Sequence, residues 1–135
     1  MRELRVDASL ENMEKVQKFI QDELMDYELS LKTENEINIA IEEIFVNIAS
    51  YAYTDGDGNA TLAFGFDENE RLMTLVIKDS GVPFNPLERA EPDISLSADE
   101  REIGGLGIFI TKKTMDTVSY AYENGNNILT MTKKI

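Results

Sequence analysis

The stretch EINIAIEEIFVNIASYAY, residues 36–53, has apolar residues at helical spacing and predicts a long helix that packs into the core. The pattern TENE directly before and into it, with Thr33 followed by Glu36, is typical of a capped helix start. We therefore expect the helix to begin at Thr33 and to run to about Tyr53. Its centre, EEIFVN at residues 42–47, places polar side chains among apolar ones, and this placement needs an explanation.

The polar pair in this segment is Glu43 and Asn47. At about 100° per residue, Asn47 lies about 40° from Glu43 and one turn further along the same helix face. Apolar residues flank the pair on both sides, Phe45 on one and Val46 on the other. A partly buried carboxylate lowers stability unless another group compensates for its lost hydration. Two interpretations remain open. Either structural hydrogen bonds satisfy the pair, or Glu43 is a general base beside the amide oxygen of Asn47, which ligates a hard cation.

The composition narrows the class of protein. The chain has 135 residues, of which 42% are hydrophobic, and this predicts one globular domain over residues 1–135. It contains no cysteine and no histidine, so proton transfer would fall to a carboxylate, lysine, tyrosine or water. The net charge of -13 argues against nucleic acid and anionic membranes as partners. We also expect a cytoplasmic protein, because no apolar run approaches the roughly 20 residues that span a bilayer.

The rest of the chain divides into short helices and strands. RELRVDA predicts a strand, and Ser9 a cap before a helix that reaches Tyr27. ATLAFGFD and RLMTLVIKD predict a hairpin after the turn TDGDGN, and VSYAYE and ILTMTKKI predict a second hairpin joined by the turn NGNN. Between the hairpins lie a long loop over residues 80–103 and a helix behind glycines. This order predicts an α+β fold, a two-layer α/β sandwich with the helices on one face of the sheet.

Two further motifs carry chemical interest. Asp79 ends an apolar strand, and Gly81 follows it at a position where a missing side chain permits close backbone approach. Gly105, Leu106 and Gly107 open the last helix, where backbone N–H groups at the positive end of the helix dipole favour an anion. Taken singly, an ordinary turn explains the first motif, and a flexible hinge explains the second.

Taken in order, Glu43-x-x-x-Asn47, Asp79-x-Gly81 and the glycine-rich helix start resemble the three boxes of the GHKL ATPase superfamily. Within that superfamily, the runs DSGVPFNP and GGLGIFITKKTMD are most similar to the bacterial anti-sigma factor serine/threonine kinases and their stand-alone relatives. The resemblance covers nearly the whole chain. It implies an ATP-binding sandwich of the GHKL type, with a mixed, mostly antiparallel sheet.

The resemblance also implies roles for the first two motifs. Glu43 would act as the general base, and Asn47 would ligate the Mg²⁺ that bridges the phosphates of ATP. Asp79 would bond the adenine amino group, and Gly81 would let the adenine lie close to the backbone. The cofactors implied are therefore ATP and Mg²⁺.

The remaining implied roles lie in the second half of the chain. The loop formed by Gly105, Leu106 and Gly107 would contact phosphate through its backbone, and residues 84–103 would form a lid. A threonine on the last strand helps to hold the adenine in this group. Thr130 fits this role because it faces opposite its neighbours along the strand, and Thr132 on the same strand face is the competitor.

The activity implied is that of a serine/threonine protein kinase which phosphorylates an anti-anti-sigma-type partner and binds a sigma factor or a similar regulator. Members of this group commonly form homodimers. Two alternatives stay open: a nucleotide-gated partner-switching module with little or no kinase activity, and a histidine-kinase-like catalytic fragment. Tyr51 and Ile103 stand where basic residues are frequent in the group and favour the first alternative. Glu43 argues against it, because a pure binding module needs no base.

Overall fold

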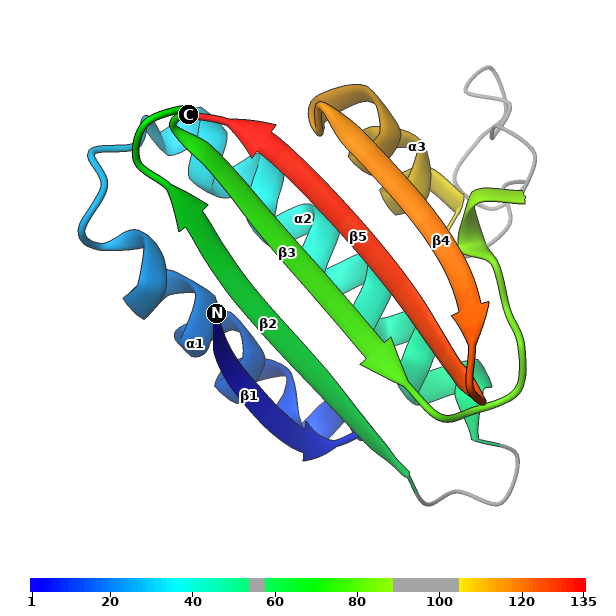
Figure 1. The fold of residues 1–135 in the computed structure, drawn as a ribbon. Helices are drawn as coiled ribbons and strands as arrows, with labels where there is room; N and C mark the ends of the chain where they lie inside the picture. Colours follow the sequence, from blue (N-terminus) through cyan, green and yellow to red (C-terminus); the bar gives the residue numbers. More distant parts are fainter. Residues whose placement is uncertain (54–57, 89–104) are drawn as a thin grey trace.

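The structure is a computed structural model that describes residues 1–53, 58–88 and 105–135. Three helices and five strands make up the described fold (Figure 1). In chain order they are β1 (Arg2–Asp7), α1 (Met13–Leu24), α2 (Leu31–Asn47), β2 (Asn59–Asp67), β3 (Leu72–Asp79), α3 (Gly105–Thr114), β4 (Thr117–Glu123) and β5 (Asn126–Lys134). Short 3₁₀ turns precede α1 and follow β3, at Leu10–Asn12 and Pro86–Glu88. Most of the turn TDGDGN and most of the expected lid fall on residues 54–57 and 89–104, outside the described residues.

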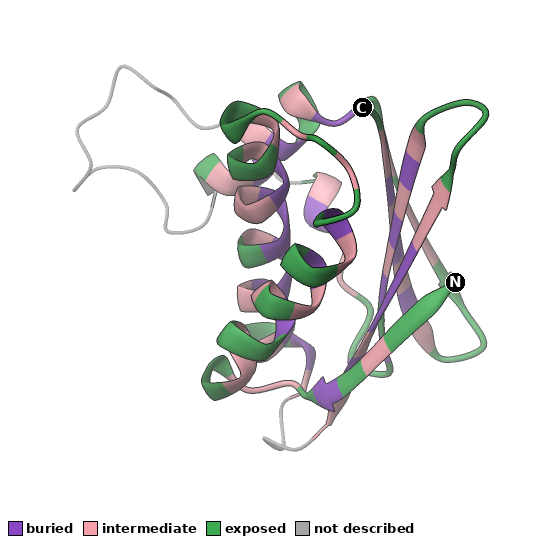
Figure 2. Cartoon of the chain, turned by 90° about the vertical axis from the view of Figure 1, so that its left-hand side faces the viewer, coloured by how far each residue is buried: buried purple, intermediate pink, exposed green. Residues whose placement is uncertain are grey.

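The strands form one sheet in the order β1-β2-β3-β5-β4. The helices cover a single face of this sheet, so the expected two-layer α/β sandwich is confirmed (Figure 2). The resemblance implied a mixed sheet, but every pairing between the described strands is antiparallel. The reason is the position of β5. It lies between β3 and β4, which run in the same direction, and it pairs antiparallel with both.

The core lies between the sheet and the helices, and α2 is its central helix. One face of α2 is buried along its length, and alternate residues of β3 are buried opposite it. The buried apolar residues of these two elements are Ile37, Ala40, Ile41, Ile44, Phe45, Met73, Leu75 and Ile77. Fully burying one such large side chain stabilises a fold by about 1.5–3 kcal/mol, so α2 is held firmly against the sheet. None of the helices in the described part of the chain is long and apolar enough to span a membrane.

The start of α2 differs from the expectation. Ser30, not Thr33, is the N-cap: its backbone is extended, and its Oγ accepts a hydrogen bond of 3.2 Å from the N–H of Thr33. The prediction at Thr33 was wrong because two capping residues lie three positions apart. The Oγ of Ser30 also donates to Oγ1 of Thr33, which places Thr33 inside the first turn. After Asn47 the helix continues as a π-helical turn over Ile48–Ala52, close to the expected end.

Both predicted hairpins are present, and the second one sets the geometry of the site. Asn124 and Gly125 join β4 to β5 with φ angles of 52° and 78°, which is the positive-φ conformation of a tight two-residue turn. Within the sheet, β3 and β5 pair so that Asp79 lies opposite Asn127. The end of β3 and the start of β5 therefore meet at one edge of the helix layer.

Candidate functional site

A pocket opens where the last turn of α2 meets the end of β3 and the start of β5. Most of its wall is apolar. Three buried polar side chains line it, Asn47, Asp79 and Asn127, and they are only 4%, 5% and 6% exposed; the phenol of Tyr120 also lines it. Phe84 and Pro86, from the segment that follows β3, form another part of the wall. An apolar slot with a few placed polar groups suits a flat ring that carries hydrogen-bonding substituents.

Asp79 is the buried carboxylate of this pocket. Its Oδ1 accepts hydrogen bonds of 2.9 Å from the N–H of Gly81 and from Nδ2 of Asn127. Burial raises the pKa of Asp79 above its ordinary value of 3.8, and the two hydrogen bonds oppose this effect without cancelling it. The second oxygen, Oδ2, accepts no hydrogen bond from the described residues. The carboxylate therefore keeps an acceptor for a ligand in the pocket.

Glu43 and Asn47 lie one turn apart on the same face of α2, as their spacing predicts. Nδ2 of Asn47 makes a long 3.5 Å contact with Oε1 of Glu43. Asn47 is buried at the pocket, whereas Glu43 is half-buried beside α3. The two polar residues are flanked by apolar ones in the sequence because this face of α2 borders a pocket and another helix.

The start of α3 packs directly on Glu43. A Cβ added at Gly107 would lie 2.3 Å from Oε2 of Glu43, so a larger residue at this position would displace the Glu43 side chain. The first backbone N–H groups of a helix have no partner within the helix and favour an anion. In α3 these groups belong to the turn that begins at Gly105 and includes Leu106. The fold therefore brings a helix start that favours an anion next to the Glu43–Asn47 pair.

The structure supplies a different reason for Gly81 from the one the sequence suggested. A Cβ added at Gly81 would lie 2.1 Å from the backbone oxygen of Ala52, at the end of the π-helical turn. The next residue, Val82, donates a 2.7 Å hydrogen bond to that same oxygen. Gly81 therefore permits the close approach of two backbone segments beneath the pocket.

Replacing Gly81 with alanine is expected to destabilise the protein by about 1–3 kcal/mol or more, because the clashing atoms are backbone atoms that cannot rotate away. Urea unfolding followed by circular dichroism would measure the loss. Ser80→Ala is the matched control, since Ser80 is adjacent and exposed. Equal unfolding midpoints for Gly81→Ala and the control would contradict the explanation.

The structure does not bring Thr130 to the pocket. Thr130 pairs with Val76 and Ser119 on the face of the sheet that carries no helices, whereas Leu129 lines the pocket. Thr132 lies on the same helix-free face and bonds Thr117 across the strands. Alternation along a strand is the reason: facing opposite Leu129 means facing away from the helices.

Asn127 is the β5 residue that reasoning from sequence missed. It lies two residues before Leu129 and so shares the pocket face of the strand. Its place in NGNN indicates a turn, and the predicted strand ILTMTKKI begins one residue after it. Counting back in steps of two from Leu129 is the sequence signal that identifies it.

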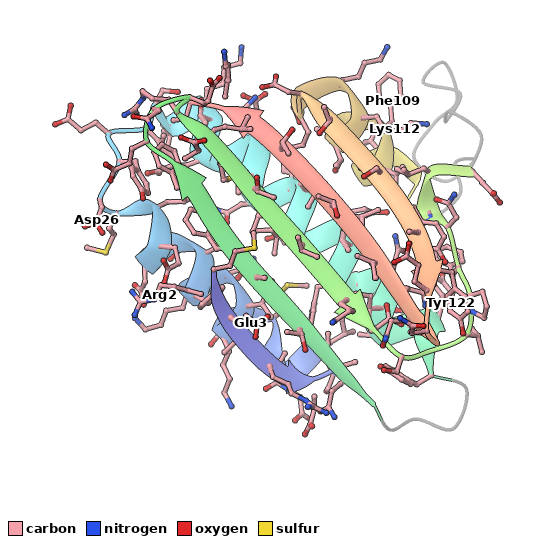
Figure 3. The ribbon with its side chains drawn as sticks, in the orientation of Figure 1. Arg2, Glu3, Asp26, Phe109, Lys112 and Tyr122 are labelled. Carbon is pink, nitrogen blue, oxygen red and sulfur yellow. The ribbon has the colours of Figure 1, made fainter. Side chains whose placement is uncertain are left out.

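Two exposed side chains contact the segment that follows β3. Tyr51 is half exposed, and its ring lies 5.9 Å from that of Phe84, which lines the pocket. Lys112 lies exposed on α3, and its Nζ donates a 3.4 Å hydrogen bond to the carbonyl of Leu87 (Figure 3). This bond connects α3 to the last described turn before the expected lid.

Comparison with known proteins adds independent findings. Residues 6–133 match the model of a family described as a histidine kinase-like ATPase domain. The chain is 29% identical over 96 residues to the serine/threonine-protein kinase BtrW of Bordetella bronchiseptica, which covers 71% of this chain and 67% of BtrW. It is 33% identical over 104 residues to the serine-protein kinase RsbW of Bacillus thuringiensis, which covers 74% of this chain. That match spans 63% of RsbW, so the chain covers less than two thirds of this relative.

Solved structures show the same fold at low identity. The RsbU and RsbW domains of a Mycobacterium tuberculosis protein superpose with a TM-score of 0.63 at 14% identity, over 99% of this chain and 32% of that one. The histidine kinase domain of a blue-light activated kinase from Erythrobacter litoralis gives a TM-score of 0.56 at 12% identity, over 78% of this chain and 46% of that one. The GHKL-type sandwich expected from the sequence is thereby confirmed.

Proposed function

Because the chain belongs to the histidine kinase-like ATPase domain family, we propose that it binds ATP in this pocket and transfers the γ-phosphoryl group to a serine or threonine of a protein substrate. The observation that carries the proposal is the meeting of three features at one place. These are the buried acceptor of Asp79, the polar pair of α2 and the glycine start of α3. The similar proteins BtrW and RsbW, both named protein kinases, support the class of reaction.

The proposed ATP contacts follow from the chemistry of each group. The adenine amino group would donate to Asp79, and the N–H groups of Gly105, Leu106 and Gly107 would receive the phosphates. With a net charge of -13, the protein needs such dipoles to accept further negative charge. The apolar walls near Ile77 and Leu129 would cover the faces of the ring.

Asn47 is the residue that fits Mg²⁺. Its Oδ1 accepts no hydrogen bond from the described residues, and it lines the pocket. The described residues contain no cluster of three acidic side chains that would hold a metal by themselves. Magnesium usually takes only one or two protein ligands and completes its shell with phosphate oxygens and water. When bound, it supplies neutralisation of the phosphate charge.

Glu43 is the proposed general base. Its carboxylate would accept the proton of the acceptor hydroxyl as that oxygen attacks the γ-phosphorus, while the bond from this phosphorus to the β–γ bridging oxygen breaks and ADP leaves. Gly107 places the first turn of α3 against this carboxylate, so the base and the helix start keep a fixed relation. Phosphoryl transfer needs positioning, charge neutralisation and a base, and this arrangement offers all three.

The proposed partners follow the resemblance of the sequence motifs. The substrate is an anti-anti-sigma-type protein, and a sigma factor or similar regulator competes with it for binding to the kinase. The kinase is cytoplasmic and forms homodimers, and its residues 1–135 form a single domain. Tyr51 supports a second candidate, a nucleotide-gated partner-switching module with little kinase activity, because it stands where a basic residue is frequent in the group that the sequence resembles. The outcome of Glu43→Gln separates the two.

Calorimetric titration of the protein with ATP, with and without Mg²⁺, tests the proposal. Wild type is expected to show saturable binding that strengthens with Mg²⁺, and Asn47→Ala to lose that dependence. The expected loss is about tenfold or more in affinity for Mg²⁺·ATP, or about 1.4 kcal/mol. Asn35→Ala, an exposed position in the same helix, is the matched control. A wild-type protein that binds no nucleotide would overturn the proposal.

A further inference from the structure

Asn127 is buried at the start of β5, and the protein uses all of its hydrogen-bonding capacity. Its Nδ2 donates bonds of 2.9 Å to Oδ1 of Asp79 and to the carbonyl of Val82. Its Oδ1 accepts a 3.0 Å bond from the N–H of Phe84 and another from the hydroxyl of Tyr120. A side-chain amide has two donor hydrogens and two acceptor lone pairs. Asn127 therefore has no donor or acceptor left for a ligand.

These four bonds join three strands and the segment that follows β3. Asp79 ends β3, Tyr120 belongs to β4, and Asn127 itself belongs to β5. Residues 82–86 contain two prolines, which have no N–H, so this segment has few backbone donors with which to attach itself. The N–H of Phe84 is attached to Asn127. The side-chain amide of Asn127 therefore attaches this segment to the sheet, as backbone hydrogen bonds attach a strand to its neighbour.

Building on the proposed function, we propose that Asn127 is a positioning residue that holds Asp79 and the Phe84 wall as one unit and thereby sets selectivity for a purine with an amino group at C6, as in adenine, over one with an oxygen there, as in guanine. Because the amide is committed to Oδ1, only Oδ2 of Asp79 remains for the base. An ionised carboxylate only accepts hydrogen bonds, so it pairs with the exocyclic amino group at C6 of adenine and is repelled by the exocyclic oxygen at C6 of guanine.

The chemistry of the alternatives shows why an amide suits this position. Aspartate would have no donor for Val82 and would place a second carboxylate against Asp79. Threonine has a single donor and a shorter side chain, so it cannot reach both acceptors. Leucine has a similar volume but leaves the N–H of Phe84 and the hydroxyl of Tyr120 without this acceptor.

Two measurements on Asn127→Leu test the inference: the affinities for Mg²⁺·ATP and Mg²⁺·GTP by calorimetry, and the hydrogen exchange of the Phe84 amide by NMR without nucleotide. We expect the preference for ATP over GTP to fall at least tenfold and the Phe84 amide to exchange at least tenfold faster. Tyr120→Phe removes one bond and is expected to change both in the same direction by less. Asn126→Leu is the matched control, since Asn126 bonds the exposed Ser80 and lies outside the pocket lining.

Unchanged nucleotide preference together with an unchanged Phe84 exchange rate in Asn127→Leu would overturn the inference. If that variant does not fold, Tyr120→Phe decides by the same two readouts, and wild-type values for both would overturn it. A wild-type protein that binds neither nucleotide would overturn the proposed function and the selectivity with it. The exchange of Phe84 is measured without nucleotide, so it still decides whether Asn127 holds the segment.

Discussion

Replacing Asp79 with asparagine is expected to abolish ATP binding and yet leave the fold at least as stable as the wild type at neutral pH. Asparagine has the same shape, and its Oδ1 can accept both existing hydrogen bonds, from Gly81 and from Asn127. Its Nδ2 would then occupy the place of the free carboxylate oxygen. This Nδ2 and the amino group of adenine are both hydrogen-bond donors and would face each other in the pocket. We therefore expect the affinity for ATP to fall by about a hundredfold or more.

The stability of this variant follows from the pKa of the carboxyl. Burial raises the pKa of Asp79 in the folded protein above the ordinary value of 3.8 that holds in the unfolded chain. A raised folded pKa gives stability that is fully present below the unfolded value and is lost as pH rises through the folded value. At neutral pH the ionised wild-type carboxylate therefore lowers stability, and asparagine removes this cost. The difference in unfolding free energy should shift in favour of Asp79→Asn between about pH 3.5 and pH 7.

Calorimetry with ATP and urea unfolding across this pH range measure the two effects. Asp22→Asn is the matched control, because it removes the same charge from the exposed face of α1. Retention of wild-type ATP affinity by Asp79→Asn would show that this carboxylate does not recognise the base. A shift of relative stability in favour of the wild type as pH rises would contradict the effect of burial.

Replacing Glu43 with glutamine is expected to lower the rate of phosphoryl transfer by about 10²–10⁴-fold while ATP affinity stays within a few-fold of wild type. Glutamine keeps the shape that fits against Gly107 and an oxygen for the contact with Asn47, but it does not accept a proton. In the proposed site, ATP binding relies on Asp79, on the helix start and on Asn47, and these are unchanged.

Transfer of labelled γ-phosphate to a purified anti-anti-sigma-type protein from the same organism measures the rate, and calorimetry measures the affinity. Glu42→Gln is the matched control: Glu42 is the next residue, exposed, and bonded to Gln17 of α1. A wild-type rate in Glu43→Gln would remove Glu43 from the role of base. ATP binding by wild type without any transfer would favour the partner-switching module.

The sequence by itself determined the helices and strands and the placement of part of the candidate site. Alternating and helical apolar patterns are local properties, so the helices and hairpins could be located from them. The pairing of Glu43 with Asn47 on one face follows from helical geometry, and the place of Asp79 follows from the end of an apolar strand. The predicted start of α2 was wrong because Ser30 and Thr33 are both suitable N-cap residues. The earlier one, Ser30, caps the helix, which makes it three residues longer than predicted at that end.

Only the tertiary structure decided which residues complete the pocket. Asn127 is 48 positions from Asp79 in the chain, and the two meet because β5 pairs with β3 in one register. A shift of that register by one residue would turn Thr130 to the helices and Asn127 away from them. The role of Gly81 likewise depends on where the end of the long helix crosses the end of β3. The register of β3 with β5 and the crossing of the helix end with β3 are set by packing over the whole core. A local sequence pattern does not contain this information.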